Sequence, residues 1–177
     1  MNHTIMNIFR KTLWGIVGLS VLTAIGSFFS QYVLGLNPCV LCILQRVSVI
    51  AVGVVALLAA FSAQRSRAGR SISALLVSIP ALYGAGVAVY QLWLQSLPPD
   101  QVPSCGPGLD YWLDTLPLKS VFEQVLTGSG ECAKVDWTLL GLSLPAWSLA
   151  FFSVLALISI WQLLRKYPPA QKAADKK

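Results

Sequence analysis

Two cysteines three residues apart are the part of this sequence best suited to chemistry. Cys39 and Cys42 lie in the segment NPCVLCILQR, and Arg46 follows them in the same segment. A disulfide across two intervening residues closes almost no loop, so it stabilises a fold little through chain entropy. The same spacing recurs in thiol oxidoreductases, whose cysteines exchange disulfides with partner thiols. The spacing therefore favours a redox-active pair over a structural one.

The element that must position these sulfurs is a helix that begins beside them. Asn37 can cap a helix and Pro38 suits its first position, which predicts both sulfurs in its opening turns. Free backbone N–H groups and the positive end of the helix dipole favour thiolate over thiol there. Because Arg46 shares one helix face with Cys39 and Cys42, we interpret it as a fixed cation for a thiolate or a reduced, negatively charged acceptor. An arginine that reaches up to the membrane interface is the alternative.

Four apolar segments of membrane-spanning length make up most of the chain. Of its 177 residues, 55% are hydrophobic and 11% are charged, whereas soluble domains average about 25% charged residues. Each segment is apolar around its circumference and long enough to cross ~30 Å of hydrocarbon. We predict spans at about 12–34, 40–62, 72–94 and 144–164. The predicted fold class is an all-α membrane protein, a four-transmembrane-helix bundle in a single integral membrane domain over residues 1–177.

Basic residues set the predicted orientation. Arg10 and Lys11 precede the first span, arginines fill the link between spans two and three, and more basic residues follow the fourth span. By the positive-inside rule, both termini and the tail 165–177 are cytoplasmic. The net charge of +6 therefore reports topology and not nucleic-acid binding. The first span could be a cleaved signal sequence, but its apolar run is long for one and no clear cleavage site follows, so we interpret it as uncleaved.

The long connection at 95–143 then lies outside the cytoplasm, in a periplasm or its equivalent, and it carries Cys105 and Cys132. Apolar residues at helical spacing in 117–127 predict a short amphipathic helix, either on the membrane surface or packed against the rest of the loop. Proline and glycine surround both cysteines, which favours a mobile connection suited to thiol exchange. Four cysteines permit three pairings, and proximity favours Cys39 with Cys42, leaving the loop pair.

The sequence offers few other routes for electrons. No histidine follows Cys42 directly, which excludes a c-type haem site, and the single histidine, His3, lies on the predicted cytoplasmic side. Cys105 and Cys132 lack the paired spacing of zinc knuckles, so we predict no metal site. Electrons taken from an external dithiol must still leave the protein. The acceptor most compatible with these features is a membrane quinone reached from the bilayer near Cys42 and Arg46.

The segment NPCVLCILQR, the four-span plan and the separated pair Cys105 and Cys132 resemble the disulfide bond formation protein B (DsbB) family, the bacterial inner-membrane thiol–quinone oxidoreductases. GSGECA and WTLLGLSLPAW are similar to that family too. The resemblance implies that a reduced DsbA-like thioredoxin-fold oxidase of the periplasm attacks Cys105, whose loop partner is Cys132. Electrons would then reach Cys39 and Cys42 through a transient Cys39–Cys132 bridge. Cys42 would face ubiquinone or menaquinone, with Arg46 assisting that step.

The chain departs from the family near the outer end of the third span. Some members carry there a histidine linked to the quinone site, whereas VYQLWLQSL offers Gln91, Leu92 and Gln95. The role of that histidine is therefore not carried over. The segment PDQVPS before Cys105 also differs from the docking sequence of other members, so the sequence does not choose among partner oxidases.

Two other functions stay open at this stage. A four-span structural or assembly protein would use two inert disulfides to brace its outer face, which is the usual role of an isolated pair such as Cys105 and Cys132. A quinone-linked thiol oxidase that serves a different partner would share every feature above. Exchange with a reduced thioredoxin-like protein separates the structural protein from both oxidases, because inert bridges would leave that protein reduced.

Overall fold

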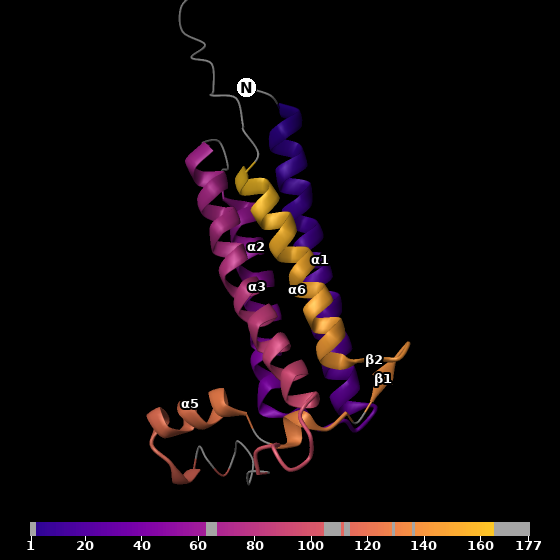
Figure 1. Ribbon diagram of the computed structural model, residues 1–177. Coiled ribbons are helices and arrows are strands. Elements are labelled where there is room, and N and C mark those ends of the chain that lie inside the picture. Colours follow the sequence, from indigo (N-terminus) through magenta and orange to yellow (C-terminus); the bar gives the residue numbers. More distant parts are fainter. Residues whose placement is uncertain are drawn as a thin grey trace, which may run out of the picture.

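Four long helices lie side by side in the computed structural model, which describes residues 3–62, 67–104, 111, 114–128, 130–135 and 137–164 (Figure 1). They are α1 (His3–Tyr32), α2 (Val40–Phe61), α3 (Arg67–Gln95) and α6 (Leu144–Leu164). Each is long and apolar enough to cross a membrane. The predicted helical fold with four candidate spans is therefore confirmed. α1 and α3 begin earlier than predicted, because apolarity marks the buried stretch of a helix and not its polar ends.

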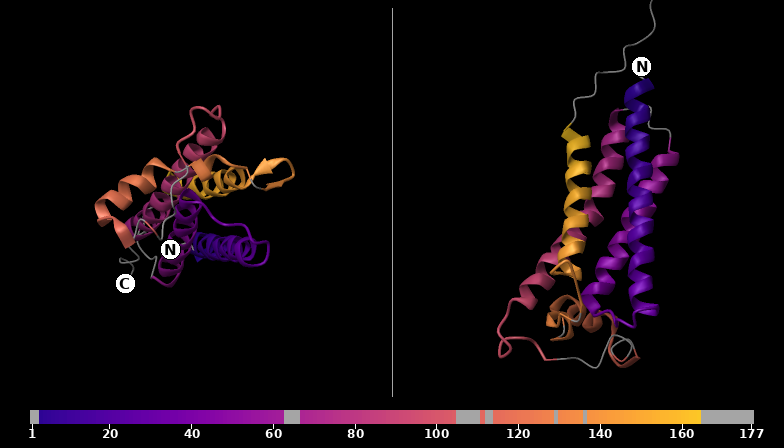
Figure 2. Two further views of the ribbon diagram at one scale, coloured as in Figure 1. Left: turned by 90° about the horizontal axis from the view of Figure 1, so that it is seen from below. Right: turned by 90° about the vertical axis from the view of Figure 1, so that its right-hand side faces the viewer.

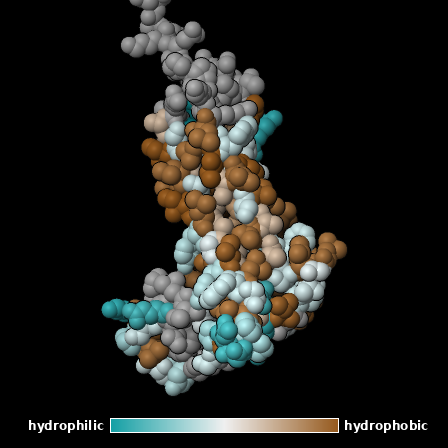
Figure 3. Space-filling model, in the orientation of Figure 1, coloured by the Kyte–Doolittle hydropathy of each residue, from teal (hydrophilic) through white to brown (hydrophobic). Residues whose placement is uncertain are grey.

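The surface of the bundle is apolar over its middle. On the face drawn in Figure 3, hydrophobic side chains cover the long helices, and more polar ones gather at the end that carries the loop elements. Large apolar side chains such as Leu22, Leu58, Leu82 and Leu157 are more than half exposed. Soluble monomers rarely expose contiguous apolar surface of this extent, whereas lipid solvates it well. The protein is accordingly a multi-pass membrane protein.

The helices pack in chain order, α1 on α2, α2 on α3 and α3 on α6. At the end where α1 begins, all four contribute to one core that includes Phe9, Val52, Ala81 and Leu155. The contact between α3 and α6 is close at Gly84, where an added Cβ would lie 2.4 Å from the Phe152 ring. A residue without a side chain lets two membrane helices approach in this way.

The opposite end, here called the cysteine end, carries the loop elements. α5 (Leu118–Thr127) extends sideways from this end, roughly at right angles to the long helices, and the 3-10 helix η1 (Gly130–Ala133) follows it (Figure 1). Val121 of α5 is buried beside Val40 of α2, while Leu118 is 78% exposed. A short helix therefore occupies the segment where one was predicted, and one of its apolar side chains packs on the bundle. Figure 2 shows α5 and the β1–β2 hairpin on different sides of this end.

A small antiparallel hairpin leads into α6. It consists of β1 (Thr138–Leu139) and β2 (Leu142–Ser143), with Leu139 opposite Leu142. Leu140 and Gly141 form its turn with φ values of 54° and 80°. The all-α prediction did not include this hairpin, because two-residue strands are too short to produce an alternating pattern in the sequence.

Candidate functional site

Cys39 is the N-cap of α2. Its φ and ψ are −67° and 168°, and its sulfur accepts a hydrogen bond from the backbone N–H of Cys42 at 3.4 Å. The prediction of Asn37 as the cap is wrong, because the helix begins two residues later than that prediction implied. The Cys39 sulfur, and not the Asn37 side chain, accepts from a free N–H of the first turn, and Pro38 lies before the helix. The prediction that both cysteines lie at the opening of this helix is confirmed.

Three of the four predicted cysteines meet at this point. The sulfurs of Cys39 and Cys42 are 3.1 Å apart, and Cys132 from η1 packs against Cys39 in one buried cluster with Leu41 and Leu94. Cys132 is fully buried. The fourth, Cys105, lies outside the described residues.

The environment of Cys39 keeps its proton in place. A side-chain hydrogen bond with Cys132 is the largest of the effects that raise the pKa of the Cys39 thiol, followed by one with Cys42 and by burial. In this form with free thiols, these contacts favour the protonated thiol at Cys39, which donates to the sulfur of Cys42 at 3.1 Å. The thiolate expected at the start of this helix stays a prediction.

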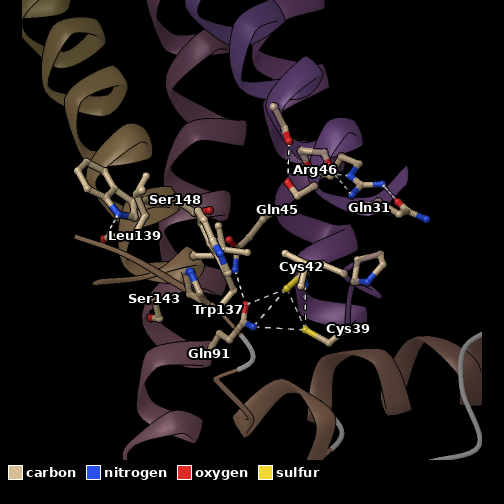
Figure 4. Close-up of a pocket in the computed structure, with 18 of the residues that line it drawn as sticks. Gln31, Cys39, Cys42, Gln45, Arg46, Gln91, Trp137, Leu139, Ser143 and Ser148 are labelled. Atoms are coloured by element: carbon tan, nitrogen blue, oxygen red, sulfur yellow. Dashed lines mark hydrogen bonds between the residues drawn. The ribbon is translucent and has the colours of Figure 1, made fainter. Parts of the chain in front are cut away.

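Two buried glutamines complete the surroundings of the sulfurs. Nε2 of Gln91 on α3 lies 3.3 Å from the sulfurs of both Cys39 and Cys42. Gln45 on α2 donates from its Nε2 to Oε1 of Gln91 at 2.7 Å. Figure 4 shows both amides pointing into the site above and beside the cysteine pair.

Sequence reasoning noted Gln91 only at the position of a missing histidine, and it missed Gln45. The available signal was chemical, because primary amides inside apolar spans are costly unless they have a partner or a function. Spacing along one helix could not show that the two amides meet across α2 and α3.

Arg46 lies near the sulfurs but is held by α1. Its guanidinium donates to the hydroxyl and carbonyl of Ser27 at 2.9 and 3.2 Å and to Oε1 of Gln31, and it lies 4.6 Å from the ring centroid of Phe28. Figure 4 shows the guanidinium turned toward Gln31 and away from the cysteine pair. The described hydrogen bonds of Arg46 are therefore to α1, and its role as a fixed cation for the site stays a prediction.

A cavity of about 920 Å³ adjoins the sulfurs between α1, α2, α6 and the hairpin. Small-molecule sites typically have about 300–1,000 Å³. The lining combines reactive or polar groups with rings, including Cys42, Arg46, Gln91, Trp137 and Phe151. Among the described residues, no group of three or more His, Cys, Asp or Glu side chains could hold a metal ion. The arrangement is suited to thiol exchange next to a site for a largely apolar molecule.

Comparison with known proteins shows the family of this chain. A family model described as disulfide bond formation protein DsbB matches residues 10–162. Disulfide bond formation protein B of Acinetobacter baylyi is 56% identical over 155 residues, which cover 85% of this chain and 91% of the relative. The protein of the same name from Neisseria meningitidis serogroup A is 46% identical over 158 residues, covering 89% and 97%. The chain belongs to the DsbB family of disulfide bond formation proteins.

Proposed function

We propose that this protein oxidises a reduced DsbA-like thioredoxin-fold oxidase of the periplasm through two relayed disulfides and passes the electrons to a membrane quinone. The observation that carries the proposal is the position of Cys39. Its sulfur contacts Cys42 at 3.1 Å on one side and shares a hydrogen bond with Cys132 of the loop. A sulfur with both neighbours can exchange disulfides with either, whereas two inert bridges would have no need to meet.

The first half-reaction oxidises the partner. A partner thiolate attacks Cys105 in the loop disulfide, forms a mixed disulfide and releases Cys132 as a thiolate. The second partner thiol then displaces Cys105, so the partner leaves as a disulfide and the loop holds two thiols. The partner has lost two electrons, and the loop has gained them.

The relay moves those electrons to α2. The thiolate of Cys132 attacks Cys39 in the Cys39–Cys42 disulfide, and the S–S bond breaks to release Cys42. Cys105 then attacks Cys132 in the resulting Cys39–Cys132 bridge, which restores the loop disulfide and frees Cys39. Each exchange breaks one S–S bond and forms another, so the net result is a reduced Cys39–Cys42 pair.

The acceptor that fits the adjoining cavity is ubiquinone or menaquinone. A quinone takes two electrons and two protons and leaves as a quinol, which returns the cysteine pair to its disulfide. Cys42 and Arg46 would hold the ring, because they line the cavity close to the reactive pair. Aromatic side chains such as Phe29 and Phe151 line the rest and would suit an isoprenoid tail.

The location we propose is the bacterial inner membrane, with the active face in the periplasm. Arg10 and Lys11 lie near the start of α1 and Arg70 near the start of α3, both at the end of the bundle opposite the cysteines. Positive charge flanking spans faces the cytoplasm. Both termini would then be cytoplasmic, and residues 1–177 would form one integral domain with its loop at 95–143.

The purified protein with a reduced DsbA-like partner and a soluble quinone analogue tests this function. We expect the quinone absorbance to fall while one partner disulfide forms for each quinone reduced. A variant with all four cysteines replaced by serine is the control, and it should transfer nothing. No turnover with the four cysteines intact would refute the proposal and favour the bracing role.

A further inference from the structure

The carboxamide of Gln91 is aimed at the cysteine pair and held in that orientation. Gln91 is 2% exposed and Gln45 is 5% exposed, so neither amide exchanges its partner for water. Gln45 donates to Oε1 of Gln91 at 2.7 Å, which leaves Nε2 to face the sulfurs of Cys39 and Cys42, each at 3.3 Å. A buried N–H group needs an acceptor, and here the acceptors are the two reactive atoms.

The strength of this contact depends on the oxidation state of the sulfurs. A disulfide sulfur is a weak acceptor, whereas a thiolate is charged and attracts N–H donors strongly. Hydrogen bonds with one charged partner are roughly twice as strong as neutral ones, and a low-dielectric site increases the difference. The amide therefore stabilises the reduced pair more than the oxidised pair.

Arg46 does not replace this donor in the structure. Its guanidinium is bound to Ser27 and Gln31 of α1, so the N–H contact to the sulfurs comes from a neutral amide. A neutral donor stabilises negative charge during the exchange but leaves no net charge behind when the disulfide forms again.

We propose that Gln91 is the hydrogen-bond donor that stabilises negative charge on the Cys39–Cys42 pair when its disulfide is reduced, and that Gln45 positions it. When the loop dithiol supplies two electrons, the Cys39–Cys42 bond breaks, one sulfur takes a proton and the other remains a thiolate facing Nε2. The catalytic meaning of this role rests on the proposed function, but the hydrogen bond itself acts on a redox equilibrium that can be measured without turnover.

The test is a redox titration of the Cys39–Cys42 pair against a dithiol buffer. The protein is the full-length chain with Cys105 and Cys132 replaced by serine, so that only this pair titrates. Gln91→Met keeps the length of the side chain and removes the donor. Loss of a hydrogen bond to a charged group predicts about a tenfold lower equilibrium constant for reduction, which for two electrons is about 30 mV.

Three further variants sharpen the titration. Gln91→Glu keeps the acceptor for Gln45, removes the donor and adds a negative charge, so we expect a larger shift in the same direction. Gln45→Met should give a smaller one, because the donor remains but is less well oriented. Gln95→Met is the matched control. Gln95 lies about one turn further along α3, and its Oε1 accepts a hydrogen bond from the hydroxyl of Ser143. The control should leave the potential unchanged.

An unchanged potential in Gln91→Met or Gln91→Glu, whichever variant folds, would overturn the proposal. An equal shift in Gln95→Met would also overturn it, because the effect would then be general to α3. If the potentials shift as expected while the wild-type protein fails to reduce a quinone analogue, the inference about Gln91 stands and the proposed function fails.

The turn of the β1–β2 hairpin supports a second, independent inference. Leu140 is 85% exposed and has a φ of 54°. A two-residue hairpin turn with positive φ at both positions favours Asn-Gly, and the left-handed region is unfavourable for leucine. Because Leu140 is exposed, packing inside the protein does not offset the cost of this backbone conformation. Contact with another apolar environment would offset it.

The hairpin lies beside the start of a candidate membrane span. β2 runs directly into α6, and Figure 1 shows the hairpin projecting sideways from the bundle at the level of the first turn of this candidate span. Trp147 in that turn donates from Nε1 to the carbonyl of Leu139 at 3.1 Å, and Leu142 is 49% exposed. Tryptophan is enriched at membrane interfaces. Figure 3 shows apolar side chains at this projecting edge.

We infer that the hairpin tip at Leu140 is seated among the lipids of the membrane. Trp137, Leu139 and Trp147 line the cavity beside the cysteines, so this wall would open to the bilayer and not to water. A molecule dissolved in lipid could then reach the cavity past the hairpin.

Photo-crosslinking tests this position without altering the cysteines. The full-length protein carries p-benzoylphenylalanine in place of Leu140, is reconstituted into vesicles of phosphatidylethanolamine and phosphatidylglycerol, and is irradiated. We expect lipid adducts at position 140 by mass spectrometry. The matched control places the same group at Asp100, an exposed loop position, where we expect few. Equal lipid labelling at the two positions, or a crosslink from position 140 to a second copy of the chain, would overturn the inference.

Discussion

The two ends of the helix bundle are built from different side chains. Where α1 begins, four helices close on a core of apolar side chains. Near the middle of the bundle, α3 meets α6 at Gly84 and Phe152 with no room for a methyl group. At the cysteine end, a cavity of about 920 Å³ lies between the helices, and thiols and amides are buried there beside apolar side chains. The apolar core therefore holds the helices together. The cysteine end, which packs less tightly, can then keep its thiols and amides in fixed positions.

Cys42→Ser should produce the largest effect, a loss of activity at the cysteine end without a loss of stability in the rest of the bundle. The variant retains a side chain of similar size at the start of α2 but cannot form the disulfide with Cys39. We expect turnover with partner and quinone analogue to fall to the background of the variant without cysteines. The thermal unfolding midpoint in detergent should stay close to wild type. Substantial quinone reduction by this variant would contradict the proposed route.

Gly84→Ala should instead lower the stability of the bundle, through the contact between α3 and α6. The added Cβ would lie 2.4 Å from the Phe152 ring, and overpacking typically costs about 1–3 kcal/mol. Gly86→Ala is the matched control on the same helix, because a Cβ there meets nothing within 4 Å. Denaturant unfolding in detergent should separate the two variants. Equal stability of both would mean that the close contact of α3 with α6 contributes little.

Arg46→His should give a smaller and more selective effect at the cysteine end. Loss of the bonds to Ser27 and Gln31 removes the fixed cation beside the cavity. Loss of one such charged contact predicts a fall of about tenfold in quinone reduction, with less change in partner oxidation. Arg46→Lys keeps the charge but lacks the planar guanidinium, so its rate of quinone reduction should lie between those of the wild type and Arg46→His. An equal fall in both half-reactions would count against a role of Arg46 at the acceptor.

The sequence predicted the elements better than the contacts between them. Apolarity along the chain was enough to find four helical spans, and the spacing of Cys39 and Cys42 was enough to predict that they lie together at the start of one helix. The cap was assigned two residues early, because a cysteine sulfur is an unusual N-cap acceptor. The tip of the hairpin left no pattern, since Leu140 at the turn is not a residue that such turns favour.

The site itself depends on how the helices are rotated against one another. Spacing placed Arg46 on the face of the two sulfurs but could not show that α1 binds its guanidinium. Gln91 on α3 and Gln45 on α2 are far apart in the sequence, so only the packed bundle shows that they meet at the cysteines. The neighbour relation of Cys132 to Cys39 came from family resemblance and not from spacing.

The central claim is that Cys39 connects the loop to the cavity, and a trapping experiment tests it most directly. In Cys42→Ser, Cys39 cannot return to its disulfide with Cys42, so its bridge to Cys132 loses one of the two thiols that would break it. After the protein is isolated with thiols blocked, peptide mass spectrometry should find a disulfide between Cys39 and Cys132 in a major fraction of the chains. A Cys39 that remains a free, alkylated thiol while Cys105 and Cys132 stay paired would contradict the relay.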